Sequence, residues 1–167
     1  HGFVRRPRDF ADRSAYDESL FNAVADVQPD LIVCAGYMRL ISPEAVRRFE
    51  ARMINIHPSL LPKYPGLDTH ARAMAAGDAE HGASVHVVTP ELDGGPVLAQ
   101  VRMPLLAGDT AESVARRLLA REHPLLVQSV RAISEGRAQL GAQRIRYDGR
   151  WLERPLQLDE HDELRLV

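Results

Sequence analysis

Two short runs of apolar residues, separated by a helix start, limit most strongly what this chain can fold into. Residues 31–35 read Leu-Ile-Val-Cys-Ala and end at Gly36, and residues 53–57 read Met-Ile-Asn-Ile-His. Runs of this length and composition are typical of strands buried in a parallel sheet. Between them, Ser42 followed by Pro43 is typical of a helix N-terminus, with a cap and then a first-turn proline. The order strand, helix, strand predicts an α/β fold.

The rest of the sequence predicts further helices and antiparallel strands. Ser14 is expected to cap a helix that ends before Pro29, and the helix from Pro43 is expected to end near Ala51. The remaining predicted elements are a helix over 69–76, strands over 82–89 and 97–103, a helical region over 109–135 interrupted or kinked near Pro124, and a hairpin over 145–151 around Asp148-Gly149. The fold class is therefore α/β, with a mostly parallel open sheet, helices on both faces and antiparallel strands toward the C-terminus.

The composition is that of one globular domain. The chain has 167 residues, of which 45% are hydrophobic and 26% charged, and its net charge is -2. No run of Lys and Arg is present, which disfavours nucleic-acid binding, and no stretch is long and apolar enough to predict a membrane span. The single cysteine, Cys34, lies inside an apolar run. It is therefore expected to be a buried, inert thiol of a cytoplasmic protein.

The strand at 53–57 ends in polar side chains that suit acyl-transfer chemistry. Residues two apart in a strand share a face, so the Asn55 amide and the His57 imidazole point the same way. Pro58 then turns the chain off the sheet, at the carboxyl edge where open α/β sheets bind ligands. An amide donor beside an imidazole suits a reaction that develops an oxyanion at a carbonyl carbon. The alternative is that both side chains only satisfy backbone groups at a strand end.

A second cluster, Glu-Leu-Asp-Gly-Gly-Pro at residues 91–96, also has two interpretations. Taken alone, this sequence predicts a turn between two strands. In the functional interpretation the Asp93 carboxylate faces His57 and favours its protonated form, so that the ring can serve as a proton donor. The chain has seven His residues but no paired metal-ligand motif, so no metal is predicted.

Together these segments resemble the 10-formyltetrahydrofolate-dependent formyltransferases. The resemblance rests on Asn-Ile-His-Pro-Ser-Leu-Leu-Pro at 55–62, on residues 91–96, and on Gly-Tyr-Met-Arg-Leu-Ile-Ser-Pro at 36–43, and it covers the chain from about Phe10 to Gln139. These motifs are long and correctly ordered, which favours the catalytic interpretation of both clusters. The resemblance implies a Rossmann-like formyltransferase fold.

Two further segments narrow the resemblance. Lys-Tyr-Pro-Gly-Leu at 63–67 and the strand at 81–86 are similar to those of members that transfer the formyl group of 10-formyltetrahydrofolate to glycinamide ribonucleotide in purine synthesis. The alternatives are members that formylate methionyl-tRNA, members that hydrolyse formyltetrahydrofolate, and a non-catalytic folate-binding remnant. The implied partners are two small molecules, glycinamide ribonucleotide and formyl folate, with no nucleic acid and no membrane, and no oligomeric state is predicted.

The resemblance also implies roles for individual residues. Asn55, His57 and Asp93 would form the catalytic trio. The folate pocket would be lined by Arg13, Met38, Arg39, Leu40, Ile41, Asn55, Thr89, Pro90, Glu91, Leu92 and Asp93. The nucleotide would contact Leu119, Ala120, Arg121 and Glu122, with the Glu122 carboxylate accepting hydrogen bonds from ribose hydroxyls. Core packing is the alternative for Met38, Leu40 and Leu119, and a solvated helix face is the alternative for Glu122.

One part of the family pattern does not occur in this sequence. The family opens with a strand, a glycine-rich loop and a helix that together cradle the substrate phosphate. No glycine-rich turn of that kind is found in residues 1–167. The sequence is therefore expected to be a single formyltransferase domain over residues 1–167 that is N-terminally incomplete.

Overall fold

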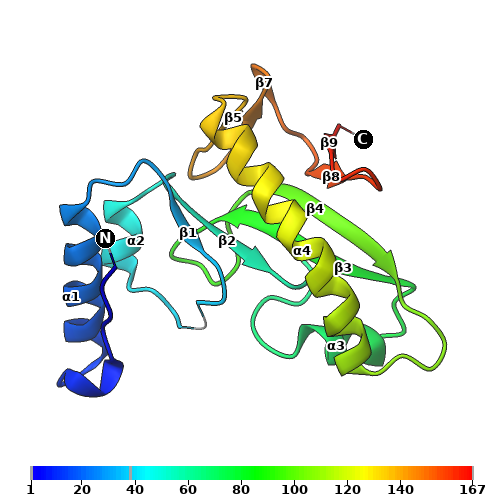
Figure 1. The fold of residues 1–167 in the computed structure, drawn as a ribbon, viewed down its shortest axis with the longest axis horizontal. Coiled ribbons are helices and arrows are strands. Elements are labelled where there is room, and N and C mark those ends of the chain that lie inside the picture. The colour runs from blue at the N-terminus through cyan, green and yellow to red at the C-terminus, as the bar shows by residue number, and fades with distance from the viewer. Residues whose placement is uncertain (1, 38, 167) are drawn as a thin grey trace.

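A computed structural model describes residues 2–37 and 39–166 of the chain (Figure 1). Met38, predicted to line the folate pocket, lies outside the described residues. The elements in chain order are a 3-10 helix η1 (Pro7–Asp9), α1 (Arg13–Asp26), β1 (Ile32–Cys34), α2 (Pro43–Arg48), β2 (Met53–His57), α3 (Thr69–Ala75), β3 (Glu80–Val87), β4 (Val97–Pro104), α4 (Ala111–Ser134), β5 (Ala138–Gln139), β6 (Arg146–Tyr147), β7 (Arg150–Trp151), β8 (Leu156–Leu158) and β9 (Leu164–Arg165).

The main sheet is mixed. Within the described residues it has six strands in the order β1-β2-β3-β4-β8-β9. β1 pairs with β2 in parallel, as β4 does with β8, and the other neighbours pair antiparallel. Four of these strands, β1, β2, β4 and β8, therefore run in one direction, and β3 and β9 run in the other. The predicted Rossmann-like sheet of mostly parallel orientation is confirmed, and antiparallel pairing already begins at β3, in the centre of the sheet.

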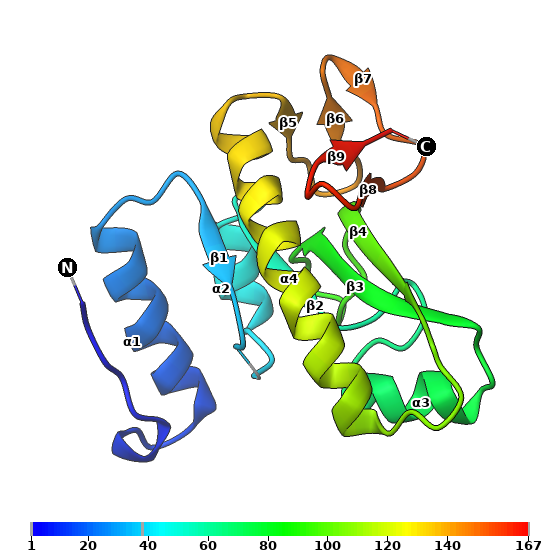
Figure 2. The ribbon, with the colours of Figure 1, turned by 45° about the vertical axis from the view of Figure 1, so that its right-hand side comes forward.

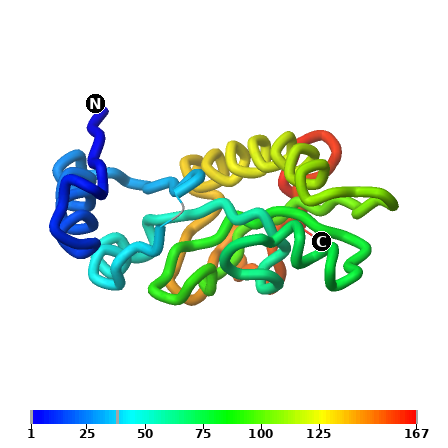
Figure 3. Tube along the Cα trace, turned by 90° about the horizontal axis from the view of Figure 1, so that it is seen from below, coloured from blue at the N-terminus to red at the C-terminus, as the bar shows by residue number. Residues whose placement is uncertain are grey.

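Helices cover both faces of this sheet, as the sequence predicts. On one face α4 packs its apolar side against the strands, with Leu118 and Ile54 in the larger core cluster. On the other face α1 and α2 pack near β1 and β2, where Phe21 and Phe49 contact Met53. Met53 and Ile54 are neighbours in β2 and point to opposite faces. Figure 3 shows α4 along one side of the strands, with α1 and α2 gathered at the end that carries the N-terminus.

A small second sheet packs against the same core. It has the order β5-β6-β7 among the described residues, and Ala138 and Tyr147 bring it into the larger apolar cluster. The predicted hairpin is confirmed: β6 and β7 are joined by Asp148 and Gly149, whose φ angles are 47° and 78°. Positive φ at both turn residues is the geometry that a two-residue hairpin of type I′ requires. Figure 2 shows this hairpin beside β8 and β9.

Two predicted helix boundaries are wrong. Helix α1 is capped by Asp12 rather than Ser14: the Asp12 carboxylate accepts a hydrogen bond from the Ala15 amide at 2.9 Å. Asp12 has the extended backbone that a cap needs, whereas Ser14 is already helical. Helix α2 has the expected Ser42 cap but ends at Arg48, before the predicted end at Ala51.

The sequence predicts an interruption or a kink near Pro124, and the interruption is wrong, because α4 continues through this residue. Proline removes one backbone donor from a helix interior. The turns on either side are held by the fully buried side chains of Leu118 and Leu125, which pack on the sheet. Tertiary packing of the apolar face therefore outweighs the local cost of the proline.

The structure bears on the predicted state of Cys34 and on the prediction of no membrane span. Cys34 is buried, as expected, and this burial raises the pKa of its thiol to about 11, which keeps it protonated and unreactive. Among the helices in the described part of the chain, none combines the length and the apolar character needed to cross a membrane.

Candidate active site

The end of β2 and the second half of β3 bring four polar side chains to one face of the sheet. Asn55 and His57 share the β2 face opposite to Ile54. In the antiparallel register Asn55 lies opposite His86, and His57 lies opposite Ser84. Residues that face each other across two strands point to the same side of the sheet. The pairing of β2 with β3 therefore places Asn55, His57, Ser84 and His86 side by side.

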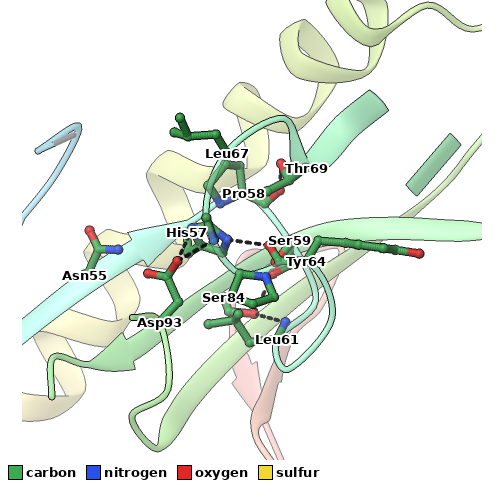
Figure 4. A network of polar contacts seen from close by, with 12 residues as sticks. Asn55, His57, Pro58, Ser59, Leu61, Tyr64, Leu67, Thr69, Ser84 and Asp93 are labelled. Carbon is green, nitrogen blue, oxygen red and sulfur yellow. Dashed lines mark hydrogen bonds and ion pairs between the residues drawn. The ribbon is translucent and has the colours of Figure 1, made fainter. Parts of the chain in front are cut away.

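Asp93 approaches this face from the loop between β3 and β4. Its carboxylate oxygen Oδ2 lies 3.6 Å from His57 Nδ1, and Oδ1 lies 3.5 Å from His86 Nε2 (Figure 4). Oδ2 also accepts a hydrogen bond from the Gly66 amide at 2.8 Å. The predicted convergence of Asn55, His57 and Asp93 on one site is thus present in the structure.

The turn chemistry of residues 91–96 explains how Asp93 reaches the site. Asp93 adopts a left-handed backbone with φ of 49°, a conformation that Asp tolerates better than most residues. Gly95 passes so close to β3 that a Cβ atom there would lie 1.9 Å from the Val87 carbonyl oxygen. Only glycine allows this approach. The two interpretations of this segment therefore hold together, because the tight turn aims the carboxylate at His57.

The other ring nitrogen of His57, Nε2, also has a hydrogen-bond partner. His57 Nε2 lies 2.9 Å from the backbone carbonyl oxygen of Tyr64, and since a carbonyl can only accept, Nε2 carries a hydrogen. The opposite nitrogen, Nδ1, faces the Asp93 carboxylate. Both ring nitrogens therefore face oxygen atoms: Nε2 donates to the Tyr64 carbonyl, and Nδ1 lies at ion-pair distance from Asp93. With a relative exposure of 7%, His57 is largely withdrawn from water.

His86 is a site residue that the sequence reasoning missed. Its Nδ1 lies 3.0 Å from the Val87 carbonyl oxygen and so carries a hydrogen, which leaves Nε2 of the neutral ring as an acceptor. Asn55 Nδ2 lies 3.2 Å from that Nε2 and donates to it. This contact fixes which end of the Asn55 amide is nitrogen and leaves its second N–H for another acceptor. The signal for His86 is its strand register opposite Asn55, which local alternation along β3 does not give.

The carboxylate of Asp93 is held in its charged form. Burial raises the pKa of Asp93, but the contact with His86, the hydrogen bond from the Gly66 amide and the nearby His57 ring together outweigh burial. The net effect lowers the pKa below the ordinary aspartate value. At neutral pH the site therefore contains a fixed negative charge beside two imidazole rings.

A buried hydrogen-bond network fastens the loop that follows β2. Ser84 Oγ donates to the Ser59 carbonyl at 2.7 Å and accepts from the Leu61 amide at 3.0 Å. Gln100 Nε2 donates to Ser84 Oγ at 3.0 Å and to the Leu61 carbonyl at 2.9 Å. The loop supplies both the Tyr64 carbonyl and the Gly66 amide to the site. Ser84 thus stabilises the site indirectly, through the path of this loop.

Of the residues predicted to contact folate, Arg39, Leu40 and Ile41 lie in the segment that follows β1, and Arg13 is the first residue of α1. Because β1 and β2 are parallel, with Cys34 opposite Asn55, this segment leaves the sheet at the same edge as the site. Arg13 of α1 donates to the Leu40 carbonyl oxygen, and the Leu40 side chain is 53% exposed. Ile41 packs against the smaller apolar cluster, so core packing holds for Ile41 and not for Leu40.

The remaining predicted residues are divided between two regions. Thr89 to Leu92 lie in the loop that carries Asp93, with the Thr89 hydroxyl 3.4 Å from the Glu91 carbonyl and Leu92 51% exposed. Leu119 to Glu122 lie on α4, which covers the opposite face of the sheet. The described residues show no hydrogen bond or ion pair between this part of α4 and the trio.

Within the α4 group the side chains differ. Leu119 is 50% exposed, so core packing does not account for it. Arg121 is engaged by the C-terminal turn, donating to Asp162 Oδ1 and to the Asp159 carbonyl, both at 2.6 Å. Glu122 is partly buried, and this burial raises the pKa of its carboxyl, with a smaller opposing effect from His123.

The fold and the site together define an α/β protein with an acyl-transfer type of site at the carboxyl edge of its sheet. A family model described as "Formyl transferase" matches residues 3–130, and this chain belongs to that family. It is 44% identical over 143 residues to the phosphoribosylglycinamide formyltransferase of Escherichia coli (strain K12), covering 86% of this chain and 68% of the relative. The corresponding protein of Haemophilus influenzae is 38% identical over 150 residues, covering 90% and 70%.

The structural comparison agrees with the sequence comparison. The phosphoribosylglycinamide formyltransferase of Coxiella burnetii, solved in complex with CHES, superposes with a TM-score of 0.82 at 41% identity. The match covers 87% of this chain and 69% of that one. This chain therefore shares the Rossmann-like formyltransferase fold with relatives named phosphoribosylglycinamide formyltransferase.

Proposed function

We propose that this chain transfers the formyl group of 10-formyltetrahydrofolate to the amine of glycinamide ribonucleotide, a step of purine synthesis. The observation that carries the proposal is the convergence of Asn55, His57 and Asp93 at the carboxyl edge of the sheet. The relatives named phosphoribosylglycinamide formyltransferase support this choice over methionyl-tRNA formylation or hydrolysis. A cytoplasmic location is part of the same proposal and is supported by the buried, reduced Cys34.

The reaction needs stabilisation of negative charge on the formyl oxygen. The amine nitrogen forms a bond to the formyl carbon, and the bond from that carbon to the folate nitrogen breaks. The free N–H of Asn55 is the donor that would hold the oxyanion formed in between, and the positive charge of the protonated His57 ring would stabilise it from nearby. Donors of this kind act strongly where water is excluded, which fits the low exposure of His57.

Asp93 has the charge and position for the proton steps. Its carboxylate lies beside His57 Nδ1 and favours the protonated ring. The proton that leaves the attacking amine must reach the departing folate nitrogen, and Asp93 with His57 provides an acceptor and a donor in one site. His86 holds the Asn55 amide in the orientation that presents N–H rather than oxygen.

The segments predicted to bind folate fit a flat ring with polar edges. Leu40 and Leu92 present half-exposed apolar side chains from the two loops that flank the trio. Thr89, Pro90, Glu91 and the backbone of residues 39–41 would supply the polar edge contacts, with Arg13 and Arg39 nearby. Glu122 would hold the ribose of the nucleotide, with Leu119, Ala120 and Arg121 beside it. No metal takes part in the proposed reaction.

The proposal is tested by measuring formyl transfer to glycinamide ribonucleotide with the purified chain. Asn55→Ala removes an oxyanion donor and His57→Ala removes the positive charge beside it, and each is expected to lower kcat by about 10²–10³. His161→Ala, at an exposed position, is the matched control and should leave kcat unchanged. Release of free formate without the nucleotide would instead indicate a hydrolase. Binding of a folate analogue with no turnover would indicate a non-catalytic protein.

A further inference from the structure

Helix α1 carries a buried carboxylate that the proposed reaction does not use. Asp17 is 1% exposed, and its Oδ2 accepts a hydrogen bond from the Ser42 amide at 3.0 Å. The same oxygen lies 3.9 Å from Nε of Arg13, one helical turn earlier. Its second oxygen, Oδ1, is buried with no hydrogen-bond partner among the described residues. A buried, incompletely paired carboxylate is costly to stability, so a role beyond packing is indicated.

Several contacts of this helix face go to one short segment of the chain. Arg13 donates to the Leu40 carbonyl, and the Arg39 guanidinium carbon lies 5.2 Å above the ring of Tyr16. With the hydrogen bond that the Ser42 amide donates to Asp17, residues 39, 40 and 42 are each in contact with a side chain of α1. Residues 39–41 lie in no strand or helix, so these contacts with α1 help to set the backbone conformation of the 39–42 segment.

Ser42 connects this segment to the start of helix α2. Its hydroxyl accepts from the Ala45 amide at 3.3 Å and caps α2, while its own amide is bound by Asp17. Asp17 therefore joins α1 to the start of α2 across the end of the 39–42 segment. Arg13, oriented by the negative charge of Asp17, fixes the middle of the segment through the Leu40 carbonyl.

We propose that Asp17 is a positioning residue for folate binding. The inference rests on the proposed function, in which residues 39–41 contact the folate. Asp17 does not touch the substrate; it holds the 39–42 backbone and the Arg13 side chain in the arrangement that binds. Preorganised contacts spare the ligand the cost of ordering a loop, so the effect falls on affinity. A contact equally strong in ground and transition states changes KM and leaves kcat alone.

The test is steady-state kinetics of Asp17→Asn, with Glu18→Gln as the control. Asparagine is close in shape and keeps an acceptor for the Ser42 amide, but it lacks the charge that orients Arg13. Asp17→Asn should raise the KM for formyl folate and the Kd of a folate analogue by about tenfold, the effect of one lost charged hydrogen bond. kcat and the KM for the nucleotide should stay unchanged. Glu18 is exposed on the same helix, and its variant should match the wild type. Equal loss for both substrates, or none for folate, overturns the proposal.

A second measurement needs no substitution. In the wild-type chain the Ser42 amide should exchange slowly with solvent before any ligand is added, because Asp17 already binds it. Fast exchange that slows only when a folate analogue is added would show that the segment is not held in advance, and would overturn the proposal. Amide exchange at Ser42 can be measured even if no formyl transfer is found. Failure of this proposal can therefore be told apart from failure of the proposed function.

Discussion

Replacing His81 should make the fold less sensitive to acid. His81 is 1% exposed, and its Nε2 lies 3.0 Å from Nδ1 of His70, with the two rings at 83°. Burial lowers the pKa of His81 to about 4, helped by the nearby His70, and burial also lowers the pKa of His70. Between the two facing nitrogens there is room for one hydrogen, so a second proton must separate the rings.

The sign and size of the effect follow from these values. In the unfolded chain the pKa of His81 is the ordinary histidine value of about 6.5, whereas in the folded chain its pKa is lowered to about 4. Protonation therefore favours the unfolded state, and stability falls as the pH drops from about 6.5 to about 4. Each pKa unit corresponds to about 1.4 kcal/mol. Allowing for solvent around the half-buried His70, we expect a loss of about 2 kcal/mol in the free energy of unfolding.

The assay is urea unfolding of the wild type and of His81→Gln at pH 7 and at pH 4.5. Glutamine places an amide near the position of Nε2 but cannot take up a proton in this range. Aspartates such as Asp93 lose their stabilising charge in both proteins, so the difference between the two pH dependences isolates His81. The wild type should lose about 2 kcal/mol more than the variant. Equal losses would refute the reasoning, and His161→Gln should behave as the wild type.

Two further predictions concern residues around the site. Ser84→Ala should lower the free energy of unfolding by about 2–4 kcal/mol in a urea titration, because it leaves the buried Leu61 amide without a partner and removes the hydrogen bond to Ser59; a change below about 0.5 kcal/mol would contradict the network. Glu122→Gln should raise the KM for the nucleotide and leave kcat nearly intact, because it removes a contact made equally in ground and transition states. A collapse of kcat in that variant would assign Glu122 to the chemistry instead.

Local signals in the sequence predicted the elements that local chemistry determines. The strand from Met53 to His57, the Ser42 cap and the turn at Asp148-Gly149 are all found where their residue types indicate. Each of these depends on neighbours within a few positions, such as a side-chain cap or a pair of positive φ angles. The facing of Asn55 and His57 was predictable for the same reason, since strand geometry alone sets it.

The features that were missed depend on contacts between distant segments. His86 enters the site only through the register of β3 against β2, and β8 becomes a strand only because β4 is beside it. Pro124 is tolerated because α4 packs against the sheet. Helix propensity is a property of single residues and does not include this packing. The convergence of Asp93 on His57 was obtained from a family resemblance, since turn chemistry alone gave no direction for the carboxylate.

The sheet order has a consequence for how the protein acquires its site during folding. β2, β3 and β4 are consecutive in the chain and adjacent in the sheet, and the segment they span contains Asn55, His57, His86 and Asp93. Residues 58–79 connect β2 to β3 and residues 88–96 connect β3 to β4, so both pairs close smaller loops than the pair of β4 and β8, and we expect them to form earlier. β8 can join β4 only after α4 and the small sheet have been passed. We therefore expect the groups of the proposed active site to assemble in the first part to fold, and the face of α4 proposed to contact the nucleotide to be added to them afterwards.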